Sequence, residues 1–123
     1  MGTIIAVGFG GAIGAIFRWS VGIIASQATN QPFWGTASVN LIGSFLVGFL
    51  FILFEGRLPV SDVLRTGILV GLLGGFTTFS TFSMEILNMM MLGFHLRALT
   101  YTIVSVTLCV AGTWGGIALA RSM

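Results

Sequence analysis

Charged residues are scarce in this sequence. Only 7% of its 123 residues are Asp, Glu, Lys or Arg, whereas a typical soluble domain carries about 25%. There is no lysine, and the three acidic residues are Glu55, Asp62 and Glu85. So few charges cannot cover the surface of a domain folded in water, and a lipid environment is therefore predicted.

Residues that carry out catalysis or bind metals are also rare. The chain has one cysteine, Cys109, and one histidine, His95. A single cysteine excludes a disulfide framework within the chain, and no catalytic pair or triad lies at a usable spacing. The few arginines form no basic cluster with interleaved aromatic residues of the kind that binds nucleic acid. The sequence therefore predicts neither an enzyme nor a nucleic-acid-binding protein.

Hydrophobic residues, in contrast, make up 56% of the chain, and its mean hydropathy is +1.08. About 20 mainly apolar residues are enough to cross a bilayer as a helix. Four such runs lie between short polar or turn-forming stretches, at about residues 3–25, 33–54, 63–92 and 97–120. We predict an all-α integral membrane protein in which residues 1–123 form a single transmembrane domain.

The third run is too long for one straight span. Its 30 residues would extend about 45 Å as a helix, beyond a hydrocarbon core of roughly 30 Å. Paired glycines, Gly74 and Gly75, precede Thr77 and Thr78 near its middle. We predict a helix broken near residues 74–78. Broken backbone at this depth must be buried in protein or line a wet cavity.

Glycine is abundant, with 18 copies, and several recur at every fourth residue. Such faces of small residues allow membrane helices to approach closely, and close packing is the interpretation we favour for most of them. They are Gly10 and Gly14; Gly67, Gly71 and Gly75; and Gly112 and Gly116.

Polar side chains form two stripes within the spans. In the second span Asn40 shares a helix face with residues one turn away on either side, Thr36 and Ser44. In the fourth span the same spacing relates Tyr101, Ser105 and Cys109. Two interpretations stay open from these residues alone: hydrogen bonds between helices, or the lining of a route for a polar solute.

The remaining candidates are two aromatic residues and two charges. Phe79 and Phe82 follow the predicted break at a spacing of three, so they point the same way in a resumed helix. Their positive ring edges suit an anion and their faces a cation, although packing alone is the ordinary role of such residues. Arg18 and Glu85 are expected within or near the membrane boundary, as functional groups or as anchors that reach the interface.

The arginines do not fix the orientation of the chain. With both termini on one side of the membrane, that side carries Arg57, Arg65 and Arg121, and the other carries Arg97. This bias is small for a rule that acts through basic residues in short loops. A chain of this kind is expected to insert both ways and to pair with an inverted copy of itself.

Three motifs resemble those of the Fluc, or CrcB, family of fluoride channels. They are GGxxGAxxRW at residues 10–19, NxxGxFxxG at residues 40–48 and GGxTTFSTFSxE at residues 74–85. The third is highly specific, and with length and span number the resemblance covers essentially the whole chain. It implies a passive channel that exports fluoride from the cytoplasm across a bacterial inner membrane and so relieves fluoride toxicity.

The resemblance also implies an assembly and a set of site residues. The channel is expected to be an antiparallel, dual-topology homodimer with two pores and a central structural sodium ion. Backbone carbonyls of Gly74 and Thr77 from both copies would hold the sodium ion. The predicted fluoride pathway consists of Asn40, Phe79, Ser80, Phe82, Tyr101 and Ser105. Cys109 stands where a hydroxyl is expected, and Arg18 and Glu85 are candidates for a vestibule or an anchor.

Two other functions compete with that of a fluoride channel. A proton-coupled small multidrug exporter has the same length and span number, but its chemistry needs a carboxylate in the first span, where this chain has only Arg18. A non-transporting subunit held together by glycine faces would not need polar stripes beside a broken helix. The fluoride channel is therefore the preferred prediction.

Overall fold

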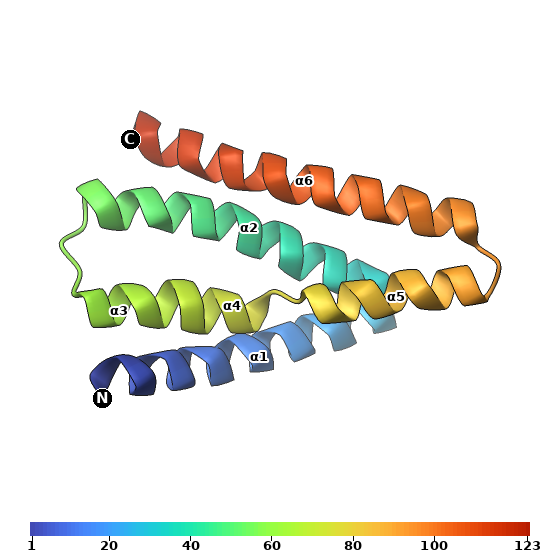
Figure 1. Cartoon of the computed structure of the whole chain (residues 1–123), viewed down its shortest axis with the longest axis horizontal. Helices are drawn as coiled ribbons and strands as arrows, with labels where there is room; N and C mark the ends of the chain where they lie inside the picture. Colours follow the sequence, from blue (N-terminus) through green and yellow to red (C-terminus); the bar gives the residue numbers. More distant parts are fainter.

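All four apolar runs form helices. The computed structural model describes all 123 residues and contains no strand (Figure 1). Each of its four long helical segments is long and apolar enough to cross a membrane, which confirms the predicted all-α architecture. In chain order the elements are α1 (Gly2–Thr29), α2 (Phe33–Gly56), α3 (Asp62–Thr66), η1 (Gly67–Leu72), α4 (Leu73–Phe76), α5 (Phe79–Met91) and α6 (His95–Ser122).

The first helix continues past its predicted end at residue 25. The Thr29 hydroxyl donates to the carbonyl of Ala25 at 2.7 Å, which keeps this polar residue inside the helix. Asn30 then adopts the left-handed conformation, with φ at 53°, and its amide donates to the Ser26 carbonyl at 2.9 Å. Asparagine tolerates this conformation better than most residues do. The helix therefore ends at Asn30, and the polar residues before it do not stop it.

The third apolar run is divided by backbone geometry at the threonines. Thr77 and Thr78 are extended, with ψ at 158° and 115°, between α4 and α5. Gly74 and Gly75 are both helical, so the glycines within the predicted region 74–78 are not themselves the interruption. A wide π-helical stretch, η1, precedes α4, and no sequence pattern predicted it.

Glycines bring the helices into backbone contact, as predicted. In Figure 1, α1 runs along α3 and α4, and α2 lies beside α6. A Cβ atom at Gly14 would overlap the carbonyl oxygen of Leu72, and one at Gly116 would overlap that of Phe45. Only glycine permits such an approach, so these two interfaces hold α1 against the third segment and α6 against α2.

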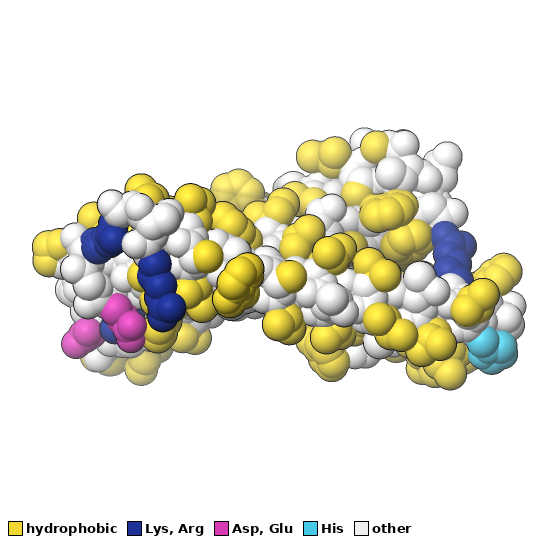
Figure 2. Space-filling view, turned by 90° about the horizontal axis from the view of Figure 1, so that it is seen from above, with side chains coloured by type: hydrophobic (Ala, Val, Ile, Leu, Met, Phe, Trp, Pro, Cys, Tyr) yellow, Lys and Arg dark blue, Asp and Glu magenta, His cyan; other side chains and the backbone are white.

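Charged side chains gather at the two ends of the molecule (Figure 2). Both termini and the connection between α2 and α3 lie at one end (Figure 1). There Arg65 pairs with Glu55 at 3.6 Å, and Arg57 donates to the carbonyl of Arg121. At the other end Arg97 lies over the Phe33 ring, 4.9 Å from its centroid. Between these ends the face seen in Figure 2 shows many hydrophobic side chains and no charged one, as expected for a membrane-spanning protein.

Candidate ion pathway

The side chain of Asn40 stabilises the interruption between α4 and α5. Its Nδ2 donates to the Thr78 carbonyl at 2.9 Å, and its Oδ1 accepts from the Thr78 amide at 2.7 Å. The side-chain amide thus replaces the helical partners that an extended residue loses. A buried backbone group without a partner costs about 1–3 kcal/mol, so Asn40 makes the interruption tolerable within a membrane.

Threonine side chains complete the interruption. The hydroxyl and the amide of Thr77 both donate to the Leu73 carbonyl at 3.0 Å, which ends α4. The Thr78 hydroxyl accepts from the Thr81 amide at 3.2 Å and so caps α5. Thr78 is only 7% exposed and was not among the predicted site residues. The sequence signal for it was a threonine placed where a helix resumes, the usual N-cap pattern.

The same geometry releases two backbone carbonyls. In a continuous helix the Gly74 carbonyl would accept from the Thr78 amide, which instead donates to Asn40. The Thr77 carbonyl would accept from the Thr81 amide, which instead donates to the Thr78 hydroxyl. Carbonyl oxygens freed in this way are suitable ligands for a hard cation. No group of three or more His, Cys, Asp or Glu residues is placed to hold a metal ion.

A groove of about 380 Å³ opens beside this junction, between α2, α6 and the third segment. It brings together four predicted pathway residues, Asn40, Phe79, Phe82 and Ser105, and Cys109 also lines it. Gly74 and Thr77, whose carbonyls are predicted to bind sodium, lie on its wall as well. Residues from three segments of the sequence therefore converge on one groove.

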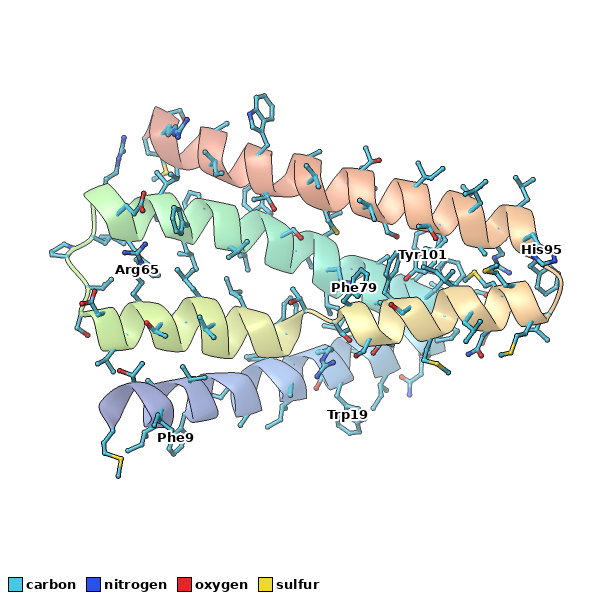
Figure 3. All side chains as sticks on the ribbon, in the orientation of Figure 1. Phe9, Trp19, Arg65, Phe79, His95 and Tyr101 are labelled. Carbon is cyan, nitrogen blue, oxygen red and sulfur yellow. The ribbon has the colours of Figure 1, made fainter.

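The two phenylalanines are held differently. Their ring centroids are 5.6 Å apart, but Phe79 is 76% exposed and Phe82 only 5%. Figure 3 shows Phe79 at the start of α5, next to the interruption. Phe82 instead packs edge-on against the Tyr101 ring, with centroids 5.2 Å apart. Phe82 is fixed by the fold of one chain, whereas the Phe79 ring has an uncovered face.

Tyr101 and Ser80 lie next to the groove and do not line it. The Tyr101 hydroxyl donates to Oε2 of Glu85 at 2.8 Å. The Ser80 hydroxyl is 3.3 Å from that of Thr78, on the exposed side of α5. Their place in a fluoride pathway stays a prediction.

Glu85 and Arg18 line a second cavity of about 530 Å³ between α1, α2 and α5. The Thr36 hydroxyl donates to Oε1 of Glu85 at 2.7 Å, so the carboxylate accepts from both α2 and α6. Arg18 forms neither an ion pair nor a hydrogen bond within the chain, and the one ion pair of the molecule joins Arg65 to Glu55. The two intramembrane charges thus share a cavity without touching.

Chemically, the groove suits a small anion better than a cation. The Nδ2 group of Asn40 donates one hydrogen to Thr78 and has a second hydrogen without a partner in the chain. Ser105 supplies a hydroxyl, and ring edges of the phenylalanines carry partial positive charge. No carboxylate lines this groove, so a cation there would meet no formal negative charge and only the released carbonyls of Gly74 and Thr77.

Comparison with known proteins gives consistent matches over most of the chain. The family model described as CrcB-like protein, Camphor Resistance (CrcB), matches residues 5–117. Among similar proteins, the fluoride-specific ion channel FluC of Magnetococcus marinus is 47% identical over 94% of each chain. The proteins of the same name from Roseiflexus sp. and Geobacter sulfurreducens are 44% identical over 97% of each chain and 41% identical over the full length of each.

Proposed function

The chain belongs to the CrcB family, and on that premise we propose that its fluoride pathway is the groove lined by Asn40, Phe79, Phe82 and Ser105. The protein is a multi-pass membrane protein and a fluoride ion channel, so it is not an enzyme. One observation carries the pathway: an amide from α2, a hydroxyl from α6 and two aromatic rings from α5 line one groove beside the interruption. A proton-coupled multidrug exporter is disfavoured.

Fluoride is small and strongly hydrated, so a pathway has to replace its lost water. Asn40 and Ser105 offer hydrogen-bond donors, and the ring edges of Phe79 and Phe82 offer positive charge without a competing carboxylate. Transport is passive. Hydrogen fluoride crosses a membrane uncharged and dissociates in the cytoplasm, and the channel lets the trapped anion leave down its gradient.

The assembly proposed is an antiparallel homodimer. Phe79 exposes most of its ring and Gly74 has open space beside its Cα, although both border the groove. A second copy related by a two-fold axis would cover this face and complete each pathway. The weak charge bias between the two ends permits insertion in both directions.

Sodium is proposed as a structural ion at the two-fold axis of that dimer. The released carbonyls of Gly74 and Thr77 fit a hard cation, but two oxygens from one chain are too few. Two copies of the chain supply four carbonyl oxygens. A bound sodium ion would hold the interruptions of the two copies together. Fluoride would be contacted by side chains of the protein and not by the sodium ion.

The proposed function is tested by anion efflux from liposomes that contain the purified protein. We expect an ion-selective electrode to record rapid fluoride release and no chloride release. Equal release of both anions, or of neither, would contradict a fluoride channel. Dialysis against sodium-free buffer is expected to abolish release, and sodium is expected to restore it. Unchanged release after dialysis would remove Gly74 and Thr77 as sodium ligands.

The antiparallel arrangement is tested with a single introduced cysteine. In a Cys109→Ser background, Met123→Cys places a thiol at the exposed C-terminal end of α6. A membrane-impermeant maleimide is expected to label about half of the copies in intact cells, since both orientations should be equally populated. Labelling of all copies, or of none, would show a single orientation and exclude dual topology.

A further inference from the structure

The first halves of α2 and α6 leave a groove between them. In its second half α6 meets the α2 backbone, because Cβ atoms at Gly48 and Gly116 would overlap the carbonyl oxygens of Thr113 and Phe45. Before Gly112, α6 contains no glycine, and helices without small residues cannot approach as closely. The gap that results is a groove of about 760 Å³, which we call the outer groove.

The outer groove is lined mainly by aliphatic and aromatic side chains that the chain itself leaves uncovered. Trp34, Val104 and Leu108 are 51%, 47% and 48% exposed. The lining residues come from α2, α6 and the turn before α6, and only Ser105 and Cys109 also line the groove beside the interruption. Contiguous uncovered apolar side chains of this kind mark a surface that contacts protein or lipid.

One end of the outer groove carries a positive charge. Arg97 lines the groove from the first turn of α6, beside His95 at the end of the molecule (Figure 3). Its guanidinium group donates to Oε1 of Gln31 at 2.9 Å and lies over the Phe33 ring. Neither of these partners carries a charge, and a guanidinium group has several further N–H donors. The positive charge of Arg97 is therefore not compensated within the chain.

The three carboxylates of the chain lie elsewhere. Glu55 pairs with Arg65 at the opposite end of the molecule, where α3 begins with Asp62. Glu85 lines the cavity beside α1 and not the outer groove. Charge complementarity to Arg97 thus requires an anion from outside the chain, and the apolar wall beside it requires an apolar group.

We propose that the outer groove binds an anionic phospholipid, with its phosphate at Arg97 and an acyl chain along the apolar wall. The start of a membrane-spanning helix places Arg97 at the boundary of the hydrocarbon core, at the depth of the lipid phosphates. Basic pockets between membrane helices bind anionic headgroups, and the planar guanidinium group matches a phosphate. A zwitterionic lipid brings its own cation, which Arg97 repels. This site does not depend on which ion the channel conducts.

The experiment measures how lipids quench the fluorescence of Trp34 on the groove wall. Trp19→Phe and Trp114→Phe leave Trp34 as the only tryptophan. The protein is placed in vesicles of phosphatidylcholine with brominated chains, which quench tryptophan, and unbrominated phosphatidylglycerol is added in increasing fractions. We expect phosphatidylglycerol to displace the quencher with about fivefold preference, the contribution of one basic residue at an anionic lipid.

Variants at Arg97 test the charge that carries this preference. Arg97→Gln should bind the two lipids equally at Trp34, because the positive charge is lost. Arg97→Lys keeps the charge and should keep most of the preference. Arg57→Gln removes a guanidinium group at the opposite end of the molecule, and it should leave the preference at Trp34 unchanged.

A second reporter tests whether the effect is confined to the outer groove. Trp114 lies on α6 outside the groove and is 72% exposed. In a chain that keeps only Trp114, Arg97→Gln should not alter the relative binding of the two lipids. An equal change at Trp34 and Trp114 would show general attraction of anionic lipid to the protein and would overturn a site in the groove.

Three further results would overturn the proposal. The first is equal binding of both lipids at Trp34 when Arg97 is present. The second is absence of quenching at Trp34, which would show that protein, such as a second copy of the chain, closes the groove. The third is loss of the preference in inorganic phosphate but not in sodium chloride of equal ionic strength, which would assign the site to free phosphate.

Native mass spectrometry of the unaltered chain provides the test if the tryptophan variants do not fold. The protein is mixed in detergent with equal amounts of phosphatidylglycerol and phosphatidylcholine. We expect it to retain phosphatidylglycerol preferentially and Arg97→Lys to do the same, with less retention by Arg97→Gln. Equal retention of the two lipids by the unaltered chain would overturn the proposal.

Discussion

The two halves of the third apolar segment are held by different chemistry. Before the interruption, α4 lies against α1 through backbone contacts, with Gly75 facing the Gly11 carbonyl and Gly14 facing that of Leu72. After it, α5 is held by side chains, including hydrogen bonds to Glu85 and ring contacts of Phe82. The first half is a close-packed support. The second half carries the exposed and polar groups that an ion can meet.

The difference shows how a membrane protein combines rigidity with a polar route. Backbone contact between glycine faces needs no polar side chain and excludes water. Polar side chains buried at the same depth need hydrogen-bond partners, and the structure has no buried side-chain nitrogen or oxygen without one. Variants in the first half should therefore affect assembly, and variants in the second half should affect conduction.

The largest expected effect is on the glycine contacts of α1. Gly14→Val would drive a branched side chain into the Leu72 carbonyl and the Phe76 amide. We expect a loss of at least about 3 kcal/mol of stability, at the upper end of overpacking effects, because backbone atoms cannot move aside. Size-exclusion chromatography of detergent-solubilised protein should show almost no folded material.

The matched control for this variant is Gly8→Val, on the same helix. A Cβ at Gly8 meets no atom within 4 Å. Its elution profile and yield should match those of wild type. If both variants fold equally well, the close approach of α1 to α4 is not what holds this half of the molecule.

The second-largest expected effect is the loss of fluoride conduction when Phe79 is replaced. Phe79→Ile removes an aromatic ring edge from the groove but leaves a residue of similar polarity at an exposed position. We expect fluoride efflux to fall by about tenfold or more, since no other group at that point offers positive charge to the anion. The folded yield should be unchanged.

Phe9→Ile is the control for the loss of an aromatic ring. Phe9 is 71% exposed and lies on α1, away from the groove (Figure 3). Efflux through this variant should equal that of wild type. If Phe79→Ile conducts as fast as wild type, Phe79 is only a packing residue. The second half of the third segment would then not be shown to differ from the first half in conduction.

A smaller effect is expected at the junction itself. Asn40→Asp replaces the Nδ2 donor with an oxygen that faces the Thr78 carbonyl, now 2.9 Å from Nδ2. We expect a loss of about 2 kcal/mol, the cost of a broken hydrogen bond to a buried group, together with reduced efflux. Thermal unfolding of the purified protein measures the first quantity. Asn88→Asp, at an exposed position of α5, should leave both the thermal stability and the fluoride efflux unchanged.

The sequence was sufficient for the helices and the close approaches. Long apolar runs and four-residue glycine spacing are local patterns, and the helix ends differ from prediction mainly at Thr29, whose hydroxyl bonds within its own helix. The partners of polar residues depend instead on how distant segments meet. Asn40 and Thr78 are 38 positions apart, and Thr36 and Glu85 are 49 apart. No spacing rule could pair them.

The interruption between α4 and α5 depends both on a local sequence pattern and on a contact between distant segments. The sequence predicted a helix broken near residues 74–78, but Gly74 and Gly75 are both helical, and the Gly11 backbone lies where a side chain of residue 75 would be. The extended residues are Thr77 and Thr78, where an amide from another helix replaces the lost helical bonds. Glycine here permits close packing, and hydrogen bonding decides where the helix opens.

The smallest expected effect concerns how tightly α2 packs against the interruption between α4 and α5. A Cβ at Gly43 would overlap the Cγ2 methyl group of Thr77, so Gly43→Ala should cost about 1–2 kcal/mol in thermal unfolding. Adding Thr77→Ser removes the methyl group and keeps the hydroxyl that donates to Leu73, so the double variant should recover most of the loss. Gly56→Ala, which has open space, should cost nothing. A double variant no more stable than Gly43→Ala would mean that α2 is held away from Thr77 by other contacts. Recovery would show that the second span and the junction fit each other at a single methyl group, between the close-packed half and the conducting half.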